Sequence, residues 1–139
     1  MISAMQQPWS IVIEQLAELD RGQDFAALGQ ALQQLPPDIP EEHRPAITHW
    51  RGKAALLEDK FEVAVRQLAI ATLLDPQRSA NHYLLGAALV RQQKWLDART
   101  ALIRALQLQP ALKAAHLELA TATQAELLES LLRETTTSE

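Results

Sequence analysis

The amino-acid sequence predicts an all-α fold, a short right-handed superhelix of helical hairpins with a long C-terminal capping helix. The first observation behind this is a constant step along the chain, which takes Gly52 to Gly86 and Pro76 to Pro110. The second is that aromatic residues make up only 4% of the chain, while Ala and Leu dominate. The third is a C-terminal stretch that lacks helix-breaking residues. A step of about 34 residues is typical of two-helix units that stack on one another.

Residues 8–35 are expected to form a degenerate first hairpin. Apolar residues recur at helical spacing in 8–20 and again in 24–35, and Gly22 marks the turn between them. Residues 36–45 follow and hold Pro36, Pro37, Pro40 and Pro45. Because this density of proline opposes helix formation, we expect a connecting loop there.

Two further hairpins are expected over 45–78 and 79–112, with helices near 46–58, 60–74, 78–92 and 95–108. Gly86 and Ala98 lie where the two helices of a hairpin must approach closely, since a glycine inside a helix usually has a packing reason. From residue 111 to Thr135 no Gly, Pro, Asp or Asn interrupts the chain. We therefore expect one capping helix over 111–133, followed by a frayed polar tail.

The repeated residues resemble the pattern of the tetratricopeptide repeat (TPR). The second repeat matches at Leu85, Gly86, Leu89, Ala98, Leu102, Ala105 and Pro110, and the first at Gly52, Ala64, Leu68, Ala71 and Pro76. The first repeat departs from the pattern at Arg51 and Ala55. The resemblance implies a non-enzymatic domain that binds a peptide or helix of another protein in a concave groove.

Carried over residue by residue, the resemblance also implies which side chains line this groove. The candidates are His49, Trp50, Lys53, Leu57, Tyr83, Ala87, Val90, Arg91, Leu117 and Gln124. Lys53 and Arg91 would supply two cations over an apolar floor, which suits a segment with apolar anchors and an acidic group. Some TPR proteins bind acidic C-terminal tails of chaperones through paired Lys and Asn residues. Here only Lys53 could match, so that activity is not predicted.

Other classes of function find little support in the sequence. The net charge is −4, the basic residues are scattered, and no nucleic-acid partner is expected. Neither a signal peptide at residues 1–7 nor a membrane span is found, which favours a cytoplasmic protein. There is no cysteine and no catalytic motif, so we expect neither an enzyme nor a cofactor. His82 and His116 are related by the same step as the two glycines, and we expect a structural role for them, not a metal site.

The capping helix carries a second candidate interface, formed by Leu127, Leu128, Leu131 and Leu132. These leucines either fold back onto helix 95–108 or remain uncovered and join two copies of the chain as a homodimer. Two alternatives to the interaction module stay open. The chain could be an N-terminal accessory domain of a larger enzyme, such as a transferase, or a self-assembling scaffold.

Overall fold

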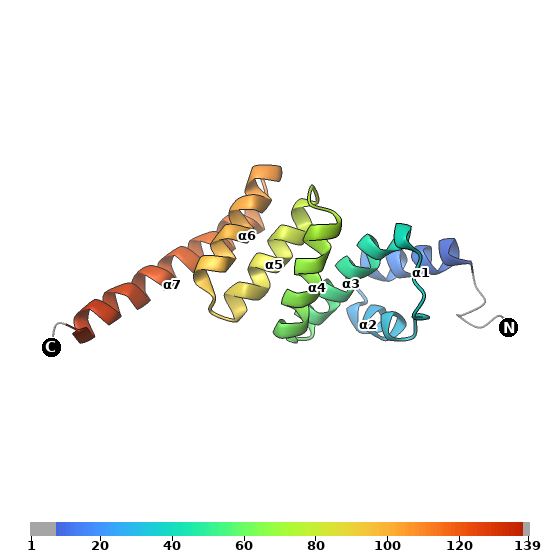
Figure 1. The fold of residues 1–139 in the computed structure, drawn as a ribbon, viewed down its shortest axis with the longest axis horizontal. Coiled ribbons are helices and arrows are strands. Elements are labelled where there is room, and N and C mark those ends of the chain that lie inside the picture. The colour runs from blue at the N-terminus through green and yellow to red at the C-terminus, as the bar shows by residue number, and fades with distance from the viewer. Residues whose placement is uncertain (1–7, 138–139) are drawn as a thin grey trace. The chain divides into compact units, whose positions relative to one another are not determined.

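The structure is a computed structural model that describes residues 8–137 of the chain (Figure 1). Every regular element in this range is helical, as expected. The helices fall into two compact units, Met1–Asp75 and Pro76–Glu139, called unit 1 and unit 2 below. The single domain expected over 1–139 stays a prediction. Residues 1–7, where no signal peptide is expected, and the last two residues of the polar tail lie outside the described range.

Unit 1 contains two helical hairpins. The first pairs α1 (Trp9–Arg21) with α2 (Phe25–Gln33), and the second pairs α3 (Arg44–Leu57) with α4 (Phe61–Leu74). Apolar side chains from the first three helices form a common buried cluster, made of Val12, Leu16, Leu28, Leu32, Ile47, Trp50 and Ala54. The expected hairpin at 8–35 is therefore part of a packed core, because its apolar stripe is buried against α3.

The loop expected over 36–45 lies two residues earlier than predicted, since α2 ends at Gln33 and α3 begins at Arg44. A turn of 3₁₀ helix, η2 (Glu41–His43), leads directly into α3, which already begins at Arg44. Pro45 lies in the first turn of α3. Proline is tolerated there because the first N–H groups of a helix have no intrahelical partner to lose. Counting Pro45 as a helix breaker was wrong for this reason.

Unit 2 consists of the hairpin α5 (Ser79–Arg91) and α6 (Trp95–Leu108), followed by α7 (Lys113–Thr137). With 25 residues α7 is the longest helix described, and Figure 1 shows it extending well past α6. It begins two residues later than expected and continues through Thr135 and Thr136, whose hydroxyls donate to the carbonyls of Leu131 and Leu132. The expectation that the tail frays from Thr135 was therefore wrong.

The two glycines at equivalent positions of the repeat lie at equivalent tight contacts. A Cβ atom placed on Gly86 would lie 2.5 Å from Cγ of Leu102 and 3.3 Å from the carbonyl oxygen of Ala98. A Cβ atom placed on Gly52 would likewise lie 2.5 Å from Cγ of Leu68. Each hairpin thus packs a leucine of its second helix directly onto the glycine of its first.

The three hairpins also share one turn geometry. Gln23, Asp59 and Gln93 have φ angles of 58°, 61° and 60°, in the left-handed region. The N–H of the next residue bonds back five positions in each case, as in Lys94 to the carbonyl of Leu89 at 3.0 Å. This is the Schellman arrangement, which satisfies a carbonyl that the helix end leaves open. The first hairpin therefore ends its first helix in the same way as the two clearer repeats.

Candidate partner-binding site

In unit 2 the predicted site residues come from α5 and α7, which lie in contact with each other. Arg91 is the last residue of α5, and its long side chain reaches the first half of α7. Leu117 lies on α7 with 71% of its surface exposed, and Gln124 is exposed further along the same helix. Ala87 and Val90 are buried, so they support the surface from below and offer a ligand little contact.

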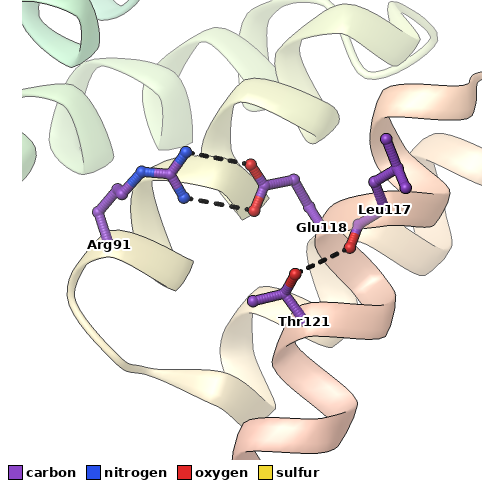
Figure 2. A network of polar contacts seen from close by, with 4 residues as sticks. All are labelled: Arg91, Leu117, Glu118 and Thr121. Carbon is purple, nitrogen blue, oxygen red and sulfur yellow. Dashed lines mark hydrogen bonds and ion pairs between the residues drawn. The ribbon is translucent and has the colours of Figure 1, made fainter.

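Figure 2 shows that Arg91 is held by a carboxylate of the neighbouring helix. Its two terminal nitrogens donate to the two oxygens of Glu118, at 3.2 Å and 3.4 Å. The Arg91 side chain is 49% exposed and that of Glu118 only 16%. A guanidinium has five N–H donors in a planar fork, so this two-fold contact fixes its orientation and leaves donors for a further acceptor.

Tyr83, the only tyrosine of the chain, is partly buried close to this ion pair. Burial raises the pKa of its hydroxyl above the ordinary value of 10.0, and the negative charge of Glu118 raises it further, while Arg91 opposes the shift. The hydroxyl is therefore neutral at physiological pH. In that state it can donate a hydrogen bond to an acceptor of a ligand.

In unit 1 the second predicted cation is also held by an acidic side chain. Nζ of Lys53 donates to Oδ1 of Asp20 at 2.7 Å, and it lies 5.2 Å from the centre of the Phe25 ring. The Lys53 side chain is 27% exposed and that of Asp20 is 22% exposed. Lys53 thus joins α3 to the first hairpin through an ion pair and a cation–π contact.

The other predicted residues of α3 differ in their access to solvent. His49 and Trp50 are buried, and Trp50 belongs to the apolar core of unit 1. Leu57 is half exposed at the end of the helix. Of the four residues predicted on α3, only Lys53 and Leu57 therefore retain surface that a partner could contact.

Sequence reasoning missed the acidic partners Asp20 and Glu118 and the ring of Phe25. A weak signal was present for one of them. Arg91 and Glu118 lie 27 residues apart, and the same separation joins Arg99 to Glu126 at 2.6 Å. A repeated basic–acidic spacing of this kind indicates a pair of neighbouring helices whose charges meet.

A hollow of about 640 Å³ lies outside the predicted site, on the α5–α6 hairpin. It is lined by both helices, with Leu85 and Leu89 from α5 and Ile103 and Arg104 from α6. Its lining combines apolar side chains with a cation, and no sequence pattern pointed to it. It is the alternative location against which the predicted site can be tested.

His82 and His116 occupy equivalent positions in successive repeats. Nε2 of His82 lies 2.9 Å from the carbonyl oxygen of Pro76, and Nε2 of His116 lies 2.8 Å from that of Pro110. A carbonyl oxygen only accepts, so Nε2 must carry the proton in both rings. Each histidine closes the turn before its own helix, and no cluster of three or more metal-binding side chains is found among the described residues. None of the helices described has the length and apolar character needed to cross a membrane.

Solved structures with the same fold are TPR domains. The first TPR of Spaghetti (RPAP3), solved with an HSP90 peptide, is 22% identical, with a TM-score of 0.71 over 84% of this chain and 91% of that one. The first TPR domain of human RPAP3 is 22% identical, with a TM-score of 0.72 over 86% of this chain and 93% of that one. The Arabidopsis OM64 TPR domain is 17% identical, with a TM-score of 0.69 over 83% and 93%.

These similarities show that the chain has a TPR-like helical repeat fold, and they confirm the predicted fold class. No family model and no curated protein matches the sequence. At this level of identity the agreement concerns the fold, so the residues that carry a function must be argued from this chain itself.

Proposed function

We propose that this chain, with its TPR-like fold, is a non-enzymatic module that binds a peptide or helix of another protein. The binding surface would be formed by α3 and α5, each the first helix of its hairpin, and by α7. The best-supported part of the site is the surface of unit 2 formed by Arg91, Tyr83 and Leu117. A cation, a neutral hydroxyl and an exposed leucine on two adjoining helices suit a segment that carries an acidic group beside an apolar anchor. The predicted part on α3, with Lys53 and Leu57, belongs to the same proposal.

The observation that carries this proposal is the contact between Arg91 and Glu118. It holds the guanidinium in one orientation while half of the side chain stays exposed. A ligand carboxylate therefore meets a cation that has already lost part of its side-chain freedom. The negative charge of Glu118 at the same time competes with the ligand for Arg91. Glu118→Gln keeps an amide oxygen that accepts from Arg91 but removes this charge, so it should strengthen binding of an acidic segment.

The test begins by cross-linking the intact chain to its partner in the source cell and identifying the bound segment by mass spectrometry. That segment is then synthesised, and its affinity is measured for three variants. Arg91→Gln should weaken binding by about ten- to a hundredfold, since a charge-assisted hydrogen bond contributes about 1.5–3 kcal/mol. Glu118→Gln should strengthen binding instead.

Arg104→Gln is the matched control. It removes the same charge from α6, where Arg104 lines the hollow outside the predicted site. Binding should be unchanged in this variant. If Arg104→Gln weakens binding while Arg91→Gln leaves it intact, the partner occupies the hollow and the proposal is wrong.

Lys53 contributes less to this recognition than Arg91. It is already engaged by Asp20 and Phe25, and less of its side chain is exposed. Reversal of its charge should reduce affinity by a smaller factor than reversal at Arg91.

The setting of the module remains part of the proposal. A cytoplasmic protein that binds no nucleic acid is the simplest setting for an acidic chain of this kind. The role of an accessory domain in a larger enzyme is tested by the reading frame of the gene, since a frame that continues past Glu139 into a catalytic domain would favour it.

A further inference from the structure

The long helix α7 has two opposite faces. One face packs on the α5–α6 hairpin, where Ala115 and Ala122 are fully buried. Glu118 and Glu126 flank this face and reach back to Arg91 and Arg99. At about 100° per residue, the opposite face carries the exposed residues Leu117, Ala120, Gln124, Leu127, Leu128 and Leu131. We call this set the outer strip.

The outer strip has the pattern of a helix-pairing surface. Leu117, Ala120, Gln124, Leu127 and Leu131 follow one another at steps of three, four, three and four residues. This alternation keeps side chains on one side of a helix and is the spacing that a second helix can follow. Leu128 is 60% exposed and Leu131 is 49% exposed, so folding back onto α6 does not cover them. Of the two alternatives that the sequence left open for these leucines, folding back onto helix 95–108 is excluded, and they remain uncovered.

The repeat itself indicates that a leucine belongs on this strip. Ala120 continues the series of Gly52 and Gly86 at the same step along the chain. In the two earlier repeats this small residue receives Leu68 or Leu102 from the following helix. Within the described part of the chain no helix follows α7, and Ala120 is exposed. Ala120 thus occupies the small-residue position of a third repeat, but it lacks the leucine that Gly52 and Gly86 receive.

We propose that a second copy of this chain covers the outer strip, with the two α7 helices antiparallel and a two-fold axis at Gln124. This register places Leu117 beside the second copy's Leu131. Ala120 then lies level with the second copy's Leu127 and Leu128, so that a leucine can cover it as Leu102 covers Gly86 within one chain. The two Gln124 side chains meet at the axis, where their amides can bond to each other.

The charges at the ends of the strip fit the same register. The strip carries no charged residue between Leu117 and Leu131. Lys113, at the start of α7, comes to lie next to the second copy's Glu134 on the same side of the helix pair, and two-fold symmetry repeats this contact at the other end. A parallel pairing would instead place equal charges side by side, which is unfavourable. Self-complementarity in both size and charge singles out a second copy as the occupant.

The first test is the mass of the intact chain in solution, measured by sedimentation equilibrium over a wide concentration range. The wild type should approach twice 15.5 kDa. Leu128→Glu with Leu131→Glu should remain at the mass of one chain, with an unchanged helical circular dichroism signal. Leu73→Glu with Leu96→Glu is the control, because these leucines are 82% and 66% exposed on other helices and should leave the dimer intact.

The second test determines the register of the two helices by disulfide cross-linking. The chain has no cysteine, so a single introduced cysteine reports one position. Gln124→Cys should cross-link two copies under mild oxidation, because residues at the axis come within disulfide distance. Leu117→Cys should not, since the antiparallel register separates the two copies of this residue. Cross-linking at Leu117→Cys, or none at Gln124→Cys, would overturn the register.

A wild-type chain that keeps the mass of one copy at all concentrations would overturn the dimer. Loss of the helical signal in Leu128→Glu with Leu131→Glu would also contradict it, because the leucines would then belong to the chain's own core. These measurements need no binding partner, so this inference can fail without the proposed function failing. A dimer would cover Leu117 and Gln124 and leave Arg91 and Tyr83 accessible. The dimer and a partner that uses Leu117 as its apolar anchor therefore exclude each other.

Discussion

Gly86 and Leu102 pack so closely against each other that no Cβ atom fits between them. The Cβ of a residue at position 86 would lie 2.5 Å from Cγ and 2.6 Å from Cδ2 of Leu102. Real side chains do not approach to this distance, so a larger residue must move α6 or the Leu102 side chain. The same distances at Gly52 and Leu68 show that this contact is a unit of the repeat.

Gly86→Ala should therefore destabilise the protein. In an unconstrained helix this change stabilises by about 1 kcal/mol. Here overpacking costs about 1–3 kcal/mol, so the net sign reverses. Gly29→Ala is the control, since its Cβ would approach only the end of the flexible Glu58 side chain, at 2.8 Å. Thermal and urea unfolding should show that Gly86→Ala is less stable than the wild type and that Gly29→Ala is not. Equal effects would mean that the Leu102 side chain simply moves aside.

This contact illustrates what the sequence makes predictable. The constant step of the repeat places Gly86, Ala98 and Leu102 at fixed points of a hairpin, and their proximity follows from that register. Helix positions were also predictable, because apolar spacing and turn residues mark them. Pro45 was misread because a proline has opposite meanings in the first turn and in the interior of a helix.

The charged contacts of the candidate site were less predictable. Asp20 and Lys53 lie 33 residues apart on helices that are not neighbours in the sequence. Their meeting depends on the rotation of each helix about its axis, which packing sets and no local pattern encodes. For Arg91 and Glu118 the sequence offered only the weak signal of a separation that Arg99 and Glu126 repeat. The burial of Trp50 likewise depends on α1 and α2, whose packing against α3 the repeat pattern does not describe.

The left-handed turns predict a stabilising change. Gln93 holds a φ angle of 60°, which costs a residue with a Cβ atom about 1 kcal/mol. Gln93→Gly removes this strain at some cost in unfolded-state entropy, so unfolding should become harder by about 0.5–1 kcal/mol. Gln92→Gly, at a φ of −86°, has no strain to relieve and should not stabilise. If Gln92→Gly stabilises the protein as much as Gln93→Gly, relief of backbone strain is not the cause.

The ionisation of Tyr83 can be followed directly, because the chain has no other tyrosine. A near-ultraviolet absorbance titration of the folded protein should give a pKa above 10.0, and the unfolded protein should give the ordinary value. Glu118→Gln should lower this pKa, since it removes a neighbouring negative charge. Arg91→Gln should raise it.

The same shift predicts how stability depends on pH. The folded-state pKa of Tyr83 lies above the unfolded value, so the folded protein keeps its proton longer. The contribution of Tyr83 to the free energy of unfolding is fully present below pH 10. It is lost as the pH rises from there through the folded-state pKa. Tyr83→Phe should remove this part of the alkaline loss in urea unfolding. If the free energy of unfolding of the variant falls with pH as steeply as that of the wild type, other groups cause the loss of stability at alkaline pH.

The final prediction concerns the ion pair between Lys53 and Asp20, which joins α3 to the end of α1. Asp20 lies in the last turn of α1, where the helix dipole disfavours a negative charge. Lys53 offsets this, so Lys53→Met should destabilise the protein. Asp20→Asn in the Lys53→Met background should then restore part of the loss, because it removes the unfavourable charge. A double-mutant cycle should give a coupling of about 1 kcal/mol that weakens in high salt.

Arg21 and Glu14 provide the matched pair for this measurement. Their ion pair is 2.8 Å long, against 2.7 Å for Lys53 and Asp20, but its side chains are 62% and 64% exposed. Water screens such a pair, so its coupling should stay below about 0.5 kcal/mol. If the two cycles give the same value, burial does not strengthen the Lys53 contact. Lys53 would then exchange Asp20 for a ligand carboxylate more readily, and only its smaller exposure and its contact with Phe25 would still rank it below Arg91 in partner binding.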